Sequence, residues 1–193
     1  MALKLITGPV VEPVSLEEAK LHLRVDLSDD DYLIDSLLRT AREYAEDVSG
    51  RAFCSQTWEL VADAWPGDRF VLPRPPLVSV TSIKYTDEDG TEATFSSSYY
   101  TVDTDSEPGK VVLKSTASWP SVTLVDINGI RVRYVCGYGA TAGDVPQRYR
   151  HAILLLAGHW YENREAIATS GAMPKEIPAG VTALLWMERV KGF

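Results

Sequence analysis

The segment from residue 145 to residue 165, VPQRYRHAILLLAGHWYENRE, constrains the fold more than any other part of the chain. Asp144 can cap a helix at this point, and Pro146 suits a first helical turn, where its missing N–H is not needed. The apolar run 152–157 then covers every side of a helix instead of one stripe. Such a helix must be buried all round, either by its own fold or by neighbouring subunits. Because nothing in the segment resembles catalytic machinery, we interpret it as an assembly element.

The size and charge of the chain narrow the possible functions. Its 193 residues allow one domain, or one small domain with another inserted in it. A net charge of −8 disfavours sequence-independent binding to DNA phosphates. Two cysteines are too few for a disulfide scaffold and favour a reducing compartment. The first residues resemble no secretory signal, and no apolar run approaches a membrane span. We expect a protein of the cytosol, or of a particle assembled there, without a membrane partner.

Helical patterns occupy both ends of the sequence. Ser15 followed by Glu18 is a capping box that predicts a short helix to about Arg24. Acidic residues 29–31 then open a second helix, whose apolar residues recur at helical spacing until Gly50. We therefore expect the first ~50 residues to be helical. After the long 145–165 helix, residues 166–177 read as a polar loop, and Pro178 opens a last short helix.

The middle of the sequence has the character of an antiparallel β domain. Strand-like segments alternate with turn signals such as the Asp87–Gly90 hairpin turn and Asn128-Gly129. The predicted strands are 56–62, 69–72, 77–85, 91–95, 99–102, 110–114 and 130–136. The predicted fold class is therefore α+β, a four-helix core (1–55 and 138–193) interrupted by an inserted antiparallel all-β domain (56–137). Cys54 and Cys136 flank the insertion.

The motifs that could form a metal or nucleotide site do not have the residue spacing that such sites need. His151, His159 and Glu162 could hold zinc, but zincin helices place their histidines at i and i+4. The glycines at 137, 139 and 143 lack the dinucleotide-binding spacing and instead suit a sharp exit from the β domain. We predict no catalytic residue, no cofactor and no metal. The aromatic residues Trp58, Trp65 and Trp119 leave one alternative, a carbohydrate- or surface-binding β module, beside their packing within the sheet.

The order and spacing of several segments resemble the gp6-like head–tail connector (adaptor) family of tailed phages. The resemblance covers nearly the whole chain, although no single motif is diagnostic. The carrying segments are VSLEEAKLHLRVD (14–26), DDYLIDSLLRTAREYAEDVSGRAF (30–53), LPRPPLVSVTSIKYTDEDG (72–90), VRYVCGYG (132–139), VPQRYRHAILLLAGHWYENRE (145–165) and PAGVTALLWMERV (178–190).

The resemblance implies a structural virion protein at the head–tail interface. Family members form a ring, commonly of twelve subunits, below the portal protein. The ring extends the DNA channel and offers a docking surface to a stopper or tail-completion protein. Genomic DNA would pass through without specific binding, and an acidic protein suits such a channel. The smallest members resemble the helical part alone, so the β domain points to a longer, insertion-bearing branch.

Three groups of residues are the candidate sites for this function. Ring contacts need two matching sides of one subunit, and channel acids need an exposed helix face. The candidate subunit interface is Ile153, Leu154, Leu155, Leu156 and Trp160. The candidate portal-docking residues are Val181, Leu184, Leu185, Trp186 and Arg189. The candidate channel lining is Asp35, Glu43, Glu46 and Asp47. The competing hypotheses are the binding module named above and a small hydrolase using a metal at His151 and His159.

Overall fold

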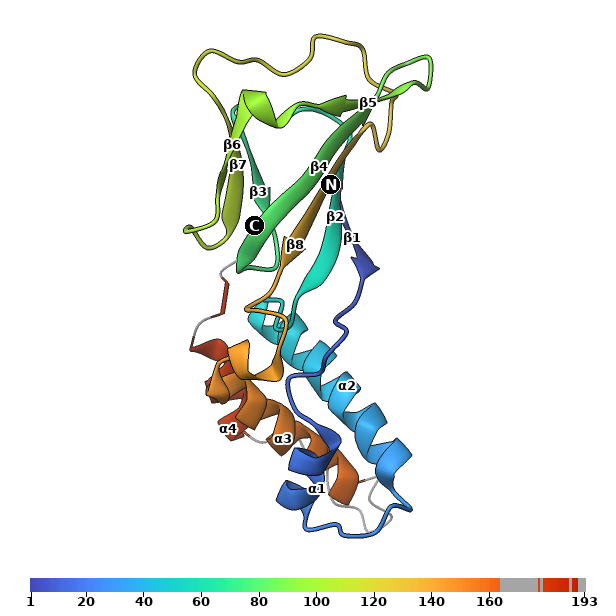
Figure 1. Ribbon diagram of the computed structural model, residues 1–193, viewed down its shortest axis with the longest axis vertical. Coiled ribbons are helices and arrows are strands. Elements are labelled where there is room, and N and C mark those ends of the chain that lie inside the picture. Colours follow the sequence, from blue (N-terminus) through green and yellow to red (C-terminus); the bar gives the residue numbers. More distant parts are fainter. Residues whose placement is uncertain (164–176, 178, 188, 191–193) are drawn as a thin grey trace. The chain divides into compact units, whose positions relative to one another are not determined.

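The chain divides into two compact units, each with its own core. The computed structural model describes residues 1–163, 177, 179–187 and 189–190; the predicted polar loop 166–177 thus falls outside the described residues, except for Ile177. The β unit comprises Met1–Val10 and Ser55–Tyr138, and the helical unit comprises Val11–Cys54 and the described residues after Tyr138. Figure 1 shows the elements of each unit along the chain. Independent folding of the β unit stays a prediction.

The helical unit contains four α-helices, and the signals that start and stop them are local. They are α1 (Leu16–Leu23), α2 (Asp31–Ser49), α3 (Gln147–Glu162) and α4 (Ala179–Trp186). The hydroxyl of Ser15 accepts a hydrogen bond from the Glu18 backbone N–H at 3.1 Å, as the capping box predicts. Gly50 ends α2 in the left-handed region at φ 71°, where a residue without Cβ is not strained.

The core of the helical unit lies between its four helices. α3 packs against α1, α2 and α4, while α2 also packs against α1 and α4. Side chains at helical spacing on α2 meet the apolar run of α3, and the rings of Phe53 and Tyr149 stack at 4.6 Å between centroids. The fully buried side chains include Ile34, Ala41, Ala45, Ala152, Leu156 and Leu185. The all-round burial predicted for α3 is therefore supplied by helices of its own chain.

The β unit consists of two antiparallel sheets. The larger sheet has the strand order β1-β2-β8-β4-β5 and the smaller has the order β3-β7-β6. The strands are β1 (Ala2–Thr7), β2 (Gln56–Ala62), β3 (Arg69–Leu72), β4 (Leu77–Thr86), β5 (Glu92–Phe95), β6 (Tyr100–Asp103), β7 (Gly109–Leu113) and β8 (Ile130–Cys136). Alternating residues of the two sheets form the core, among them Leu60, Phe70, Leu72, Ile83, Val111, Ile130 and Val132.

The observed elements confirm the predicted α+β class and correct two local predictions. Residues 2–7 are not helical; they form β1, which pairs with β2 in the register Leu3↔Leu60. Asp144 does not cap α3. Its carboxylate instead accepts hydrogen bonds from the Thr141 backbone N–H and hydroxyl, both at 2.8 Å, which closes a short 3-10 turn. Pro146 is the residue that precedes the first turn of α3. The expected sharp exit from the β domain occurs at Gly137, whose φ is 124°.

Candidate assembly surfaces

The predicted interface residues on α3 are mostly core residues of the subunit itself. Ile153, Leu154 and Leu156 are 1%, 7% and 0% exposed. Only Leu155 and Trp160 keep partly accessible surface, and the Trp160 ring meets the Tyr44 ring edge-on at 6.1 Å. Sequence periodicity showed that this run must be covered but not which chain covers it. In the structure, the covering helices are those of the same chain, so most of the run is not available to a neighbour.

The predicted portal-docking residues on α4 divide into a buried and an exposed group. Val181 and Leu185 are fully buried in the helical unit, and Leu184 is half-buried. Trp186 is 58% exposed, and the guanidinium carbon of Arg189 lies 4.9 Å from the centre of a Trp186 ring. The first two residues therefore attach α4 to its own unit, whereas Trp186 and Arg189 face outward.

One of the four acids predicted to line a channel is not on the surface. Asp47 is exposed, and the Glu43 side chain is 67% exposed. Asp35 is half-exposed and forms an ion pair with Arg39 at 3.0 Å, one helical turn away. Glu46, however, has a side chain only 6% exposed. The prediction for Glu46 is wrong, because this carboxylate is a buried part of the subunit's own structure.

Glu46 belongs to a buried ionic cluster that sequence reasoning missed. Its carboxylate pairs with Arg42 at 3.0 Å and accepts a hydrogen bond from the Phe53 backbone N–H at 2.8 Å. Arg42 also pairs with Glu12 at 2.8 Å. Burial would lower the pKa of Arg42, but the two carboxylates outweigh it and raise the pKa. The cluster thus joins the segment before α1 and the segment after α2 to the middle of α2.

A second acid is buried on the larger sheet. Glu59 on β2 pairs with Arg131 at 3.0 Å and with Arg133 at 2.8 Å, both on the neighbouring strand β8. Burial would raise the pKa of Glu59, but the hydrogen bonds from the two arginines outweigh it and lower the pKa. The alternation of β8 places both arginines on the same face, so the pairing could have been anticipated only with the strand register in hand.

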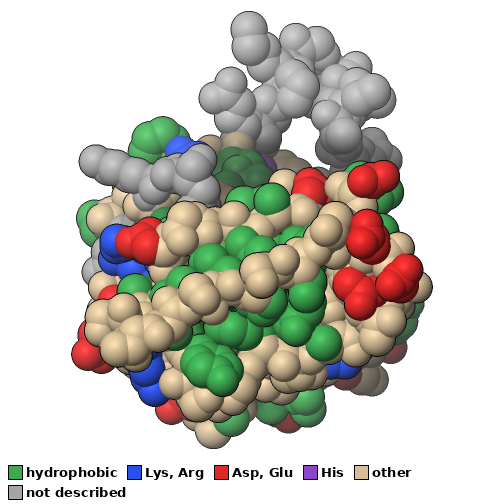
Figure 2. Space-filling model, turned by 90° about the horizontal axis from the view of Figure 1, so that it is seen from above, with side chains coloured by type: hydrophobic (Ala, Val, Ile, Leu, Met, Phe, Trp, Pro, Cys, Tyr) green, Lys and Arg blue, Asp and Glu red, His purple; other side chains and the backbone are tan. Residues whose placement is uncertain are grey.

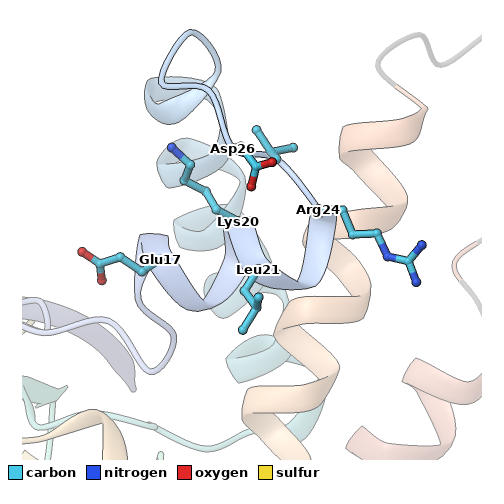
Figure 3. Close-up of a pocket in the computed structure, with 6 residues that line it drawn as sticks. Glu17, Lys20, Leu21, Arg24 and Asp26 are labelled. Carbon is cyan, nitrogen blue, oxygen red and sulfur yellow. The ribbon is translucent and has the colours of Figure 1, made fainter.

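A groove runs along the outer face of α1. It has a volume of about 470 Å³ and is lined by Glu17, Lys20, Leu21, Arg24, Val25 and Asp26. Figure 3 shows Glu17, Lys20 and Leu21 projecting from α1, with Arg24 and Asp26 on the segment that follows. Leu21 in the groove is 82% exposed, and beyond it Leu27 and Tyr32 are exposed as well. Four of the six lining residues are charged, two acidic and two basic, and Leu21 and Val25 are the apolar ones.

The tryptophans of the β unit pack against other side chains of the same unit. Trp65 and Trp119 stack on each other at 4.7 Å within an aromatic cluster that includes Phe70 and Phe95. The Arg74 guanidinium lies 5.1 Å from the centre of a Trp58 ring. Figure 2 looks down on the loops of this unit, with hydrophobic side chains visible between backbone segments. Ring faces that stack on each other are not open to a sugar, so this arrangement favours the packing interpretation.

The described residues contain no group of three His, Cys, Asp or Glu side chains placed to bind a metal. His151 instead contacts His22 of α1 edge-on, with 6.5 Å between ring centroids. Within the part of the chain that the structure covers, no helix is long and apolar enough to cross a membrane.

Comparisons with known proteins agree with a structural connector. Residues 13–107 match the family model of the phage gp6-like head–tail connector protein. No curated protein matches the chain significantly. Three solved structures match over 100% of this chain and 97% of theirs, at 26% identity. They are the virion of a native gene transfer agent (GTA) particle, its neck computed with C12 symmetry (both TM-score 0.81) and the neck of an empty GTA particle computed with C6 symmetry (TM-score 0.80).

The fold and the comparisons together define a class, the structural proteins at the head–tail interface of a virus-like particle. Within this class, the chain is similar to the gp6-like head–tail connector family, whose model matches residues 13–107.

Proposed function

We propose that the protein assembles into a ring of twelve subunits at the neck of a virion, below the portal protein. One observation carries the proposal: the whole chain is similar to a chain of a GTA particle neck computed with C12 symmetry, with a TM-score of 0.81. The similarity extends over both units, so it is not limited to a common helical motif. Twelvefold closure requires that two different sides of each subunit match each other.

The ring extends the DNA channel of the portal and joins it to a stopper or tail-completion protein. The acids that remain available for the channel wall are Asp35, Glu43 and Asp47 on α2. Duplex DNA carries one negative charge per ~1.7 Å of its axis. At physiological salt, screening limits the repulsion to ~8 Å. An acidic wall therefore prevents adhesion of DNA without blocking its passage.

Sedimentation of the purified protein, alone and with portal rings of the same particle, tests this function. The expected result is a species of ring size that either forms alone or co-sediments with the portal. Self-assembly that depends on the portal as a template is compatible with the proposal, so the portal must be present in one arm. A protein that stays monomeric and does not bind portal rings would contradict it.

A further inference from the structure

The outer face of the larger sheet carries an excess of positive charge. Directly paired residues of neighbouring strands point to the same face of a sheet. The paired rows that cross β1, β2, β8 and β4 therefore gather cationic side chains on the face opposite the core. We call these residues the basic face: Lys4, Lys84, Arg131 and Arg133. They outnumber the carboxylates of the same face, Glu59 and Glu92, although the chain as a whole has a net charge of −8.

The two arginines of the basic face are held in place and still have free donors. The side chain of Glu59 is only 5% exposed, and its carboxylate accepts hydrogen bonds from Arg131 Nη1 at 3.0 Å and Arg133 Nη2 at 2.8 Å. The arginine side chains remain 40% and 44% exposed. Among the described residues, Arg131 Nε and Nη2 and Arg133 Nη1 have no partner. One buried carboxylate thus fixes two guanidinium groups that can each bind a further carboxylate.

The β unit also carries an ordered acidic turn between β4 and β5. Glu88 and Asp89, which we call the acidic turn, are exposed, and their carboxylates have no partner in the part of the chain that the structure describes. The backbone of the turn is fixed, because Asp87 Oδ1 accepts hydrogen bonds from the N–H groups of Asp89 at 3.1 Å and Thr91 at 2.8 Å. Figure 1 shows this hairpin projecting beyond the ends of the two strands. A projecting turn can reach the flat face of a sheet in another molecule.

The net charge of the chain indicates what kind of molecule would cover the basic face. Two copies of a chain with a net charge of −8 repel each other, unless surfaces of opposite charge meet where they touch. The basic face and the acidic turn are such surfaces, and arginine–carboxylate pairs are among the strongest charged hydrogen bonds. DNA fits the proposed function less well, because a face that binds phosphates would retain DNA that has to pass.

From this complementarity we infer that the acidic turn of one subunit docks on the basic face of the next subunit in the ring. The occupant of the basic face is a second copy of this chain. The two surfaces are different parts of one unit, so the contact is head-to-tail, as ring closure requires. The inference rests on the proposed ring and names a contact between its neighbouring subunits.

An exchange of charges between two full-length variants tests the contact. The turn variant carries Glu88→Lys and Asp89→Lys, and the face variant carries Lys4→Glu and Arg131→Glu, which leaves Arg133 paired with Glu59. Sedimentation is measured under conditions in which the unmodified chain forms rings, with portal rings if they are needed. Each variant alone should associate at least ~10-fold more weakly, because like charges then meet at every contact. An equal mixture should form rings in which the two variants alternate, because opposite charges then meet again.

Two features of the design separate this contact from general effects of charge or folding. Both variants keep a net negative charge, so their overall charges do not attract each other in the mixture. Asp105→Lys, on the exposed turn between β6 and β7, serves as the control and should assemble like the unmodified chain. If the face variant fails to fold, the turn variant decides alone, since its exposed side chains make no contact within the described fold.

The outcomes distinguish the contact from the ring itself. Normal rings from the turn variant alone, or a mixture of two folded variants that does not assemble, would overturn the contact and leave the proposed ring intact. DNA retention by the unmodified chain that the face variant loses, with rings unaffected, would assign the basic face to DNA and also overturn the contact. Failure of the unmodified chain to form rings with or without the portal would contradict the ring and the contact together.

Discussion

At the scale of single residues, whether an acid on α2 is buried or exposed depends on residues that are distant in sequence. Glu43 and Glu46 both stand on the polar face that the sequence predicts, yet only Glu43 is exposed. The difference arises because Glu12 and the backbone of Phe53 close over Arg42 and Glu46. Helical periodicity contains no information about either neighbour, so a buried carboxylate could not be distinguished from a surface one.

The first prediction concerns this buried cluster. Glu46→Ala should lower the free energy of unfolding by ~3 kcal/mol, because the buried positive charge of Arg42 loses one of its carboxylate partners. Glu43→Ala, three residues away and exposed, should change it by less than ~0.5 kcal/mol. Urea unfolding followed by circular dichroism measures both variants. Equal effects of the two substitutions would show that the Arg42–Glu46 pair contributes little to stability.

The second prediction concerns Cys54, whose burial raises the pKa of the thiol from 9.0 to about 11. The native protein should therefore not react with a maleimide at pH 8, while the unfolded protein should react at both cysteines. As pH rises from about 9 to about 11, the unfolded thiol loses its proton before the folded one does. The free energy of unfolding should accordingly fall over that range. Rapid labelling of Cys54 in the native state at pH 8 would contradict this interpretation.

At the scale of elements, strands and helices with local signals were predictable, and β1 was not. β2, β3 and β8 have the predicted bounds because turn residues delimit them on both sides. Among the described strands, β1 lies at the edge of its sheet and pairs with β2, some fifty residues further along the chain. Gly8-Pro9 does separate its short sequence ALKLIT from the helices that follow, but this signal marks only a break and does not reveal the distant partner strand. Pairing with a distant strand, and not local pattern, decides its structure.

The third prediction concerns the contribution of α4 to the stability of the helical unit. Because Val181 and Leu185 are fully buried, α4 is part of the core of the helical unit. Leu185→Ala should lower the free energy of unfolding by ~2–5 kcal/mol, and truncation at Pro178 should destabilise the unit at least as much. The exposed Thr182→Ala serves as control. A truncated protein with unchanged thermal stability would show that α4 is dispensable for the core.

At the scale of the whole molecule, the proposed ring places an acidic chain around DNA that it must not bind. Replacing Asp35, Glu43 and Asp47 together by Lys should make the assembled protein bind DNA, with an affinity that falls steeply as salt rises. Glu46 is left unchanged because its replacement would destabilise the subunit. Filter binding at several salt concentrations measures the effect, and particles carrying the variant should eject DNA slowly. Normal ejection and no DNA affinity would place this face of α2 away from the channel.

The symmetry of the assembled protein tests the central claim most directly. Electron microscopy of the purified chain, incubated with and without portal rings, would reveal the number of subunits and whether they close. The account predicts a closed ring of twelve subunits, formed alone or on the portal. Open filaments, a compact dimer, or monomers that do not bind the portal would contradict it.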